Sequence, residues 1–204
     1  MAGGDLKWFM EQTAQPEDKR RACFETLIGR VHDAVLNFRT MEKPVIASVQ
    51  GAVAGFGLSL MMACDLAIAA DSAYFSLAYG RLGLSPDGGA TWSLPRQTGY
   101  KRAMEIALLG DRFDARQACA WGLVNRVEPA ADLEAQTQAL AQRLAAGPAR
   151  ALRHTKSLLS RAFDNTLTAQ LRAEQDCFAD CTTDADFAEG LSAFFGKRPP
   201  VFGG

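Results

Sequence analysis

The sequence has almost no excess of charge of either sign, and it has only two histidines. Its 204 residues include 22 Lys and Arg against 23 Asp and Glu, a formal net charge of -1. Such a chain has no global field that attracts a polyanion or an anionic membrane. We therefore expect no nucleic-acid or membrane partner. The two histidines, His32 and His154, have no metal-ligand spacing around them, so we expect no metal.

The sequence has five cysteines, an odd number, and they are scattered along the chain. This pattern fits reduced thiols in a core better than a framework of disulfides. Cys177 and Cys181 are four residues apart and could in principle share a metal, but packing is the favoured interpretation. We expect a cytoplasmic protein without a redox cofactor.

Long uninterrupted apolar runs are absent, and the sequence does not open with a secretory signal. The stretch 51–70 approaches the length of a membrane span. Its first third is rich in glycine, and Asp65 lies well inside it. These features favour a buried turn, helix and strand in a soluble core.

Periodicity predicts an α/β fold in the first part of the chain. Apolar residues recur every three or four positions after Pro16, which predicts a helix of about six turns reaching Phe38. A β-branched run at 44–49, a helix at 58–64 and an apolar run at 66–70 then predict a βαβ unit with a parallel pair of strands. Residues 73–75 read as a third strand or an extended segment, and the turn chemistry of 81–89 prevents regular structure.

The remainder is predicted to be mostly helical. The expected helices are 100–109, 114–121, 131–146, 148–163, 166–181 and 184–196, with one strand at 123–127. The change in composition near Pro129 predicts an α/β core over 1–129 and a helical subdomain over 130–204. An apolar face near the C-terminus suits either core packing or an oligomer contact; it comprises Phe187, Leu191, Phe194 and Phe195.

Glycine is concentrated at Gly51, Gly55 and Gly57, where a predicted strand runs into a predicted helix. A turn of this kind leaves backbone N–H groups free at the helix N-terminus, where negative charge is stabilised. The loop lacks the Lys and Ser/Thr of a phosphate-binding P-loop, so a nucleotide phosphate is a poor match. A second glycine turn, residues 2–7, could direct another N–H group at the same oxygen.

Four segments together resemble the crotonase (enoyl-CoA hydratase/isomerase) superfamily across nearly the whole chain. They are AGGDLK, KPVIASVQGAVAGFGLSLMMACDLAIAAD, FSLAYGRLGLSPDGGATWSLPRQTG and LLGDRFDARQACAWGLVNRV. The resemblance implies a ββα spiral core followed by C-terminal helices that pack across subunits. It also implies an acyl-CoA thioester substrate, with coenzyme A as part of that substrate and no other cofactor, and a homotrimer or hexamer.

By motif position, the resemblance implies an oxyanion hole for the thioester oxygen. Its donors would be the backbone N–H groups of Ala2 and Phe56, with Gly55 and Gly57 allowing close approach of the backbone. The same resemblance places coenzyme A along the glycine loop and along Gly3, Gly4, Asp5 and Leu6.

The resemblance also bears on the reaction. Hydratases of the superfamily carry two glutamates, and the matching positions here are Ser59 and Tyr79, which are poor acid/base groups near neutral pH. Asp87 matches the acid of the isomerase group, including the ring-epoxide isomerase of phenylacetyl-CoA degradation. A single carboxylate suffices to move a proton between two carbons. Tyr79, Pro86 and Trp92 are then expected to contact an unsaturated or ring-bearing acyl chain.

Alternatives remain open at this point. Asp87 could instead cap the following helix, or attack a substrate as a nucleophile, although no partner histidine or tryptophan for that chemistry is apparent from the sequence. Superfamily members have several strands before the AGGDLK turn, so the resemblance implies that the N-terminal part of the fold is missing here. That expectation leaves a non-catalytic acyl-CoA binding or assembly module, or a hydratase, as rivals to the isomerase.

Overall fold

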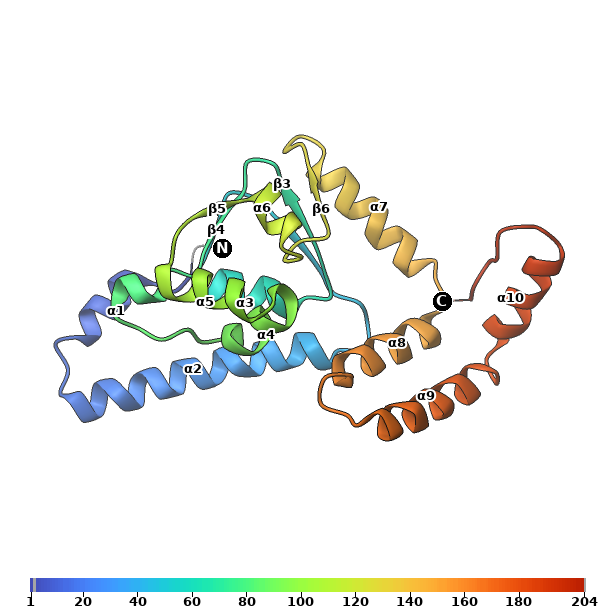
Figure 1. Cartoon of the computed structure of the whole chain (residues 1–204), viewed down its shortest axis with the longest axis horizontal. Coiled ribbons are helices and arrows are strands. Elements are labelled where there is room, and N and C mark those ends of the chain that lie inside the picture. The colour runs from blue at the N-terminus through green and yellow to red at the C-terminus, as the bar shows by residue number, and fades with distance from the viewer. Residues whose placement is uncertain (2, 204) are drawn as a thin grey trace. The chain divides into compact units, whose positions relative to one another are not determined.

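The computed structural model describes residues 1 and 3–203, which form two compact units (Figure 1). The first unit comprises Met1–Arg39 and Val45–Gln136, and the second comprises Thr40–Pro44 and the chain from Thr137 onward. The domain boundary that composition predicts after residue 129 stays a prediction.

The first unit contains two small sheets of three strands each among the described residues. One has the order β1-β3-β6 and is parallel throughout; its strands are Ile46–Val49, Leu66–Ala70 and Arg126–Glu128. The other has the order β2-β4-β5, with a parallel and an antiparallel pair; its strands are Ala52–Ala54, Tyr74–Ser76 and Phe113–Asp114. The chain changes sheet at the turn between β1 and β2, where Gly51 has a φ of 64°.

The predicted βαβ unit is confirmed as β1, α3 (Phe56–Ala63) and β3, with Ile46 paired to Leu66 in parallel register. The side chain of Asp65 accepts a hydrogen bond from Val45 N at 2.7 Å, and Asp65 N donates to Val45 O at 2.9 Å. Asp65 therefore ties the end of the helix to the start of the first strand, which is a structural role.

Two details of the predicted elements are wrong. The helix expected at 58–64 begins two residues earlier, at Phe56, because the glycine at position 55 forms its N-cap. The strand expected at 123–127 is only Arg126–Glu128. Regular strand pairing does not extend back to Asn125, because its side-chain oxygen takes the place of a backbone acceptor. That oxygen accepts from Ala67 N, and Asn125 N donates to Ala67 O, both at 2.8 Å.

The described part of the first unit also contains helices on either side of these strands. The long helix predicted after Pro16 is confirmed as α2 (Glu17–Thr40), and the other helical segments are α1 (Leu6–Gln12), η1 (Ala78–Leu82), α4 (Ala90–Thr98), α5 (Tyr100–Leu109) and α6 (Ala115–Ala120). Sequence patterns miss α1 and α4. In α4 the signal is hidden by Pro95, which cannot donate a helical hydrogen bond.

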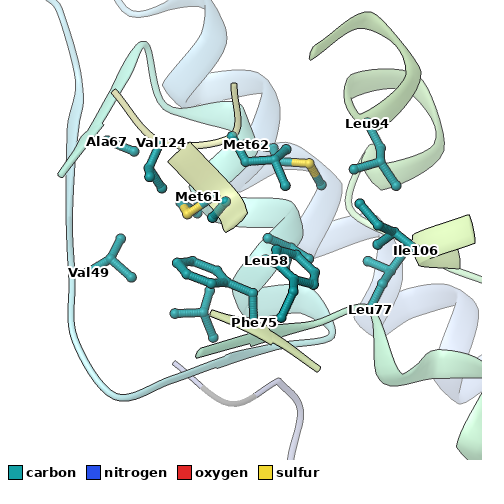
Figure 2. Close-up of a cluster of buried hydrophobic side chains, with 14 of the residues drawn as sticks. Val49, Leu58, Met61, Met62, Ala67, Phe75, Leu77, Leu94, Ile106 and Val124 are labelled. Atoms are coloured by element: carbon teal, nitrogen blue, oxygen red, sulfur yellow. The ribbon is translucent and has the colours of Figure 1, made fainter. Parts of the chain in front are cut away.

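The core of the first unit gathers around α3, with side chains from both sheets and from α4 and α5 (Figure 2). Leu58 and Phe75 are fully buried, and the Phe75 ring stacks on Phe113 with centroids 5.5 Å apart. Met62 and Leu94 are also buried. This packing holds the first turn of α3 in a fixed place, and that turn carries the glycine loop.

The helices predicted after residue 130 are confirmed as α7 (Leu133–Ala145), α8 (Ala149–Arg161), α9 (Leu167–Cys181) and α10 (Ala185–Phe195). Within the second unit, Arg198 forms a bidentate ion pair with Glu189 at 2.6 and 2.8 Å. Val201 N donates to the same carboxylate at 2.8 Å. These bonds fold the C-terminal tail back onto α10.

Candidate active site

The glycine loop places the N-terminus of α3 at the surface of the first unit. Gly55 is the N-cap, with a φ of 53° and a ψ of -127°, and no side chain caps the helix. Leu58 N and Ser59 N both donate to Gly55 O, and Gly55 N donates to Ser76 O at 3.1 Å. Among the described residues, Phe56 N has no hydrogen-bond acceptor outside α3.

The turn at the start of the chain meets this loop. A side chain added at Gly3 would place its Cβ 3.3 Å from Ala54 O and 3.9 Å from Phe56 N, and one added at Gly55 would lie 3.8 Å from the Gly3 Cα. Gly3 has a φ of 99°, which favours glycine. Ala2, the other expected donor, lies outside the described residues. The backbone of Gly3 therefore abuts the peptide that carries the Phe56 N–H.

Other expected contacts of coenzyme A lie next to this junction. Gly57 packs so closely that an added Cβ would lie 2.0 Å from Met1 O. A Cβ at Gly4 would lie 2.9 Å from the Phe9 ring. Asp5 caps α1, where its side chain accepts from Lys7 N and Trp8 N, and Leu6 begins that helix with an exposed side chain.

Asp87 is half-buried and held by two side chains. Tyr79 Oη donates to Asp87 Oδ1 at 2.5 Å, and Ser59 Oγ donates to the Asp87 carbonyl at 3.0 Å. The hydroxyl oxygens of Ser59 and Tyr79 lie 3.3 Å apart. The three positions that the sequence singles out for acid/base chemistry are thus in direct contact. Asp87 does not accept the N-cap bond of α4, because the N-cap is Gly89 and no side chain caps that helix.

The Asp87 turn packs against the start of α3, next to the glycine loop. A Cβ on Gly88 would lie 2.8 Å from Phe56 Cδ2 and 2.9 Å from Ser59 Cβ, so this turn lies against the first turn of α3. Gly88 also has a φ of 60°, which favours glycine. The Asp87 turn and the start of α3 are therefore in close contact within the first unit.

Burial raises the pKa of the Tyr79 phenol above its usual value of about 10, and the hydrogen bond to Asp87 raises it further. A raised pKa means that the fold favours the neutral phenol. The stabilisation is complete below about pH 10 and is lost as the pH rises through the higher value in the folded protein. Tyr79 thus stays a hydrogen-bond donor to Asp87 at neutral pH and cannot act as a base.

We expect Tyr79→Phe to leave the ultraviolet titration of the folded protein unchanged near pH 10, because Tyr79 does not ionise there. The measurement is the tyrosinate absorbance of both proteins against pH, with unfolded samples as the reference. In denaturant, where all three tyrosines of wild type ionise, the variant should lack the signal of one of them. If the folded variant shows the signal of one tyrosine less than folded wild type near pH 10, the Tyr79 phenol is not held as described.

Two further expected substrate contacts lie apart from these bonds. Pro86 is half-buried just before Asp87. The Trp92 ring lies on α4 against two guanidinium groups, those of Arg39 and Arg96, at 4.3 and 4.0 Å from its centroid. Such cation–π contacts stabilise the ring where it is. Contact of Pro86 and Trp92 with an acyl chain stays a prediction.

Sequence reasoning missed one residue of the site, His32. Its Nε2 accepts a hydrogen bond from Gly88 N at 3.4 Å, which brings α2 against the Asp87 turn. The sequence shows only two isolated histidines. A signal was present, because His32 lies three residues before Val35, the buried residue of α2, and positions three apart share one side of a helix.

A sequence model described as enoyl-CoA hydratase/isomerase matches residues 1–204, the whole chain. The chain belongs to the enoyl-CoA hydratase/isomerase family. This result confirms the resemblance carried by the four motifs.

Family members with similar sequences bear two kinds of name. A probable enoyl-CoA hydratase from Rhodobacter capsulatus is 44% identical over 203 residues, which are 100% of this chain and 76% of the relative. A 1,2-epoxyphenylacetyl-CoA isomerase from Escherichia coli is 44% identical over 164 residues, which are 80% of this chain and 63% of the relative.

A solved structure of an enoyl-CoA hydratase from Polaromonas sp. JS666 has a TM-score of 0.91 and 38% sequence identity to this family member. The match covers 98% of this chain and 77% of that one. It confirms the predicted α/β crotonase fold.

Two other kinds of structural feature are absent from the described part of the chain. No group of three or more His, Cys, Asp or Glu side chains is placed to hold a metal ion there. No described helix combines the length and the apolar character that crossing a membrane requires.

Proposed function

We propose that this chain is an acyl-CoA double-bond isomerase, with Asp87 as its single acid/base group. The observation that carries the proposal is the arrangement around Asp87, where Tyr79 Oη donates to the carboxylate and Ser59 Oγ donates to the backbone carbonyl. Neither hydroxyl takes up a proton at neutral pH, so hydration, which divides acid and base work between two groups, is poorly served. A 1,3 proton shift needs only one such group.

The reaction follows from the chemistry of the site. The Asp87 carboxylate removes a proton from the α-carbon of an unsaturated thioester, and the electron pair moves toward the thioester oxygen. The Phe56 N–H, and in this proposal the Ala2 N–H, donate hydrogen bonds to that oxygen as it gains charge. Each donor of this kind contributes about 2.7–4 kcal/mol of transition-state stabilisation. Asp87 then returns the proton to the γ-carbon, and the double bond has moved by one position.

Tyr79 supports this cycle as a donor. Its hydrogen bond orients one oxygen of the Asp87 carboxylate, and in this proposal the other oxygen meets the substrate. Gly55 and Gly57 let the backbone of the first residues pack closely against the start of α3, where an added Cβ would lie 3.8 Å from the Gly3 Cα and 2.0 Å from Met1 O, respectively. The name of the Escherichia coli relative supports a ring-bearing acyl group as one class of substrate.

The experiment is an assay of this chain with a 3-enoyl-CoA and, separately, a 2-enoyl-CoA, analysed by NMR and mass spectrometry. The proposal predicts conversion between the two positional isomers without a change in mass. The Rhodobacter capsulatus relative is named a probable hydratase, so hydration is the second candidate. A product that is heavier by one water would support it, and the absence of turnover on both substrates would support a binding or assembly module.

We also propose that the second unit packs against further copies of the chain to form a trimer or hexamer. Large apolar side chains lie exposed on α9 and α10: Phe178 is 72%, Phe194 77% and Phe195 78% exposed. Exposed clusters of this kind are typical of an oligomer contact. Of the two interpretations open for the C-terminal apolar face, the exposure favours the contact.

We expect the protein to sediment at three or six times the mass of one chain. The double variant Phe194→Asp, Phe195→Asp should lower that mass, because each introduced charge would be buried without a partner. The measurement is analytical ultracentrifugation, with Lys197→Asp on the exposed tail as the control for added negative charge. A wild-type protein that sediments as a monomer at assay concentrations contradicts the proposal.

A further inference from the structure

We propose that His32 is a positioning residue for Asp87 and acts by holding the peptide group that joins Asp87 to Gly88. The inference rests on the proposed function, since it concerns the placement of the base in that reaction. His32 need not touch the substrate, because its effect passes through the backbone of the turn.

Both polar ends of one peptide group are bound by side chains. The Asp87 carbonyl accepts from Ser59 Oγ at 3.0 Å and also from Ala90 N at 3.1 Å. The Gly88 N–H of the same peptide donates to His32 Nε2 at 3.4 Å. Ser59 is buried on α3, whereas His32 is an exposed residue of α2, so the two bonds come from separate helices of the first unit. Together they fix the orientation of the peptide plane.

The turn needs such a restraint because of its sequence. Gly88 and Gly89 follow Asp87 directly, with φ values of 60° and 77°. Glycine populates many backbone conformations, so a pair of them gives the turn little stiffness of its own. A rearrangement of the turn at these glycines would move the Asp87 Cα and the carboxylate with it. The two side-chain hydrogen bonds to the peptide, together with the backbone bond from Ala90 N, therefore keep the carboxylate against Tyr79.

The hydrogen bond also fixes the form of the histidine. To accept from an N–H group, Nε2 must carry a lone pair, so this hydrogen bond requires the tautomer with its proton on Nδ1. A glutamine at this position can present its side-chain oxygen to the same N–H group, whereas an alanine cannot. The two substitutions thus separate acceptance of the hydrogen bond from the mere presence of a side chain.

The test compares wild type, His32→Ala and His32→Gln in the isomerase assay. Loss of one neutral hydrogen bond corresponds to a change of about 2- to 10-fold. We expect kcat to fall by about that factor in His32→Ala, with KM changed less than about twofold, because the turn carries the base. His32→Gln should restore kcat. Asn37→Ala, an exposed position on the same helix, serves as the control and should match wild type.

A second readout keeps this proposal separate from the proposed function. Hydrogen exchange of the Gly88 amide, followed by NMR, should be slow in wild type and His32→Gln and about 2- to 10-fold faster in His32→Ala. If wild type does not turn over any enoyl-CoA, the proposed function fails, and the exchange rates still decide the role of His32. Equal exchange in wild type and His32→Ala, or a failure of glutamine to restore kcat in an active enzyme, would overturn the proposal.

Discussion

Asp87→Asn is expected to lower kcat for double-bond migration by about 10²–10⁴-fold, the contribution of a positioned general base. An asparagine side chain has nearly the same shape and can still accept the hydrogen bond from Tyr79 Oη that Asp87 accepts at 2.5 Å. It cannot take up the proton from the α-carbon at neutral pH. The loss should therefore appear in the rate of the chemical step and leave the fold intact.

The measurement is the initial rate with a 3-enoyl-CoA, together with thermal unfolding of each protein. Asp111→Asn is the matched control, because that carboxylate is in the same unit but 78% exposed. The control should retain wild-type activity and stability. Activity of Asp87→Asn within a few-fold of wild type would remove Asp87 from the reaction.

The second large effect is expected for Gly88→Ala. A Cβ there would lie 2.8 Å from Phe56 Cδ2 and 2.9 Å from Ser59 Cβ, and the backbone φ of 60° is strained for alanine. Overpacking of this kind typically destabilises by about 1–3 kcal/mol, and the left-handed backbone adds about 1–2 kcal/mol. Relief of the collision must move the Asp87 turn away from α3. A displacement of about 1 Å at a reacting group can lower a rate by about 10²-fold.

The neighbouring glycine provides the control for backbone strain. Gly89 has a φ of 77°, but a Cβ there would meet nothing nearer than Val35 at 3.8 Å. Gly89→Ala should thus share the strain without the collision. We expect both variants to unfold at a lower temperature than wild type, and Gly88→Ala to show the larger loss of activity. Equal activity of the two variants would mean that contact between this turn and α3 does not matter.

Much of the fold could be predicted from the sequence because its signals are local. The periodic apolar residues after Pro16 and the β-branched run at 46–49 each fix an element without reference to the rest of the chain. The short strand Ala52–Ala54 carries no such signal, because three small or apolar residues next to glycine suit many structures. Its pairing with Tyr74–Ser76, and hence the second sheet, depends on contacts distant in sequence.

The candidate site also has residues that the sequence reveals and residues that only the folded structure reveals. Asp87 and the glycines stand out in the sequence, since an acid in a turn and a cluster of glycines require a reason. The role of Tyr79 as donor to that acid is not visible, because it depends on burial and on a contact between the η1 segment and the turn. His32 is hidden for a similar reason: it is separated from Gly88 by 56 residues, and only the packing of α2 brings them together.

Formation of an enolate at this site can be measured without any double bond. Phenylacetyl-CoA in D₂O has an acidic α-hydrogen and no isomer to form, so deuterium enters its α-carbon only if a base removes that hydrogen. We expect wild type to exchange it and Asp87→Asn to do so about 10²–10⁴-fold more slowly, as NMR of the recovered thioester would show. Exchange at the same rate in both proteins, or none in a wild type that still converts enoyl-CoA, would contradict a carboxylate and a backbone N–H acting together on one thioester.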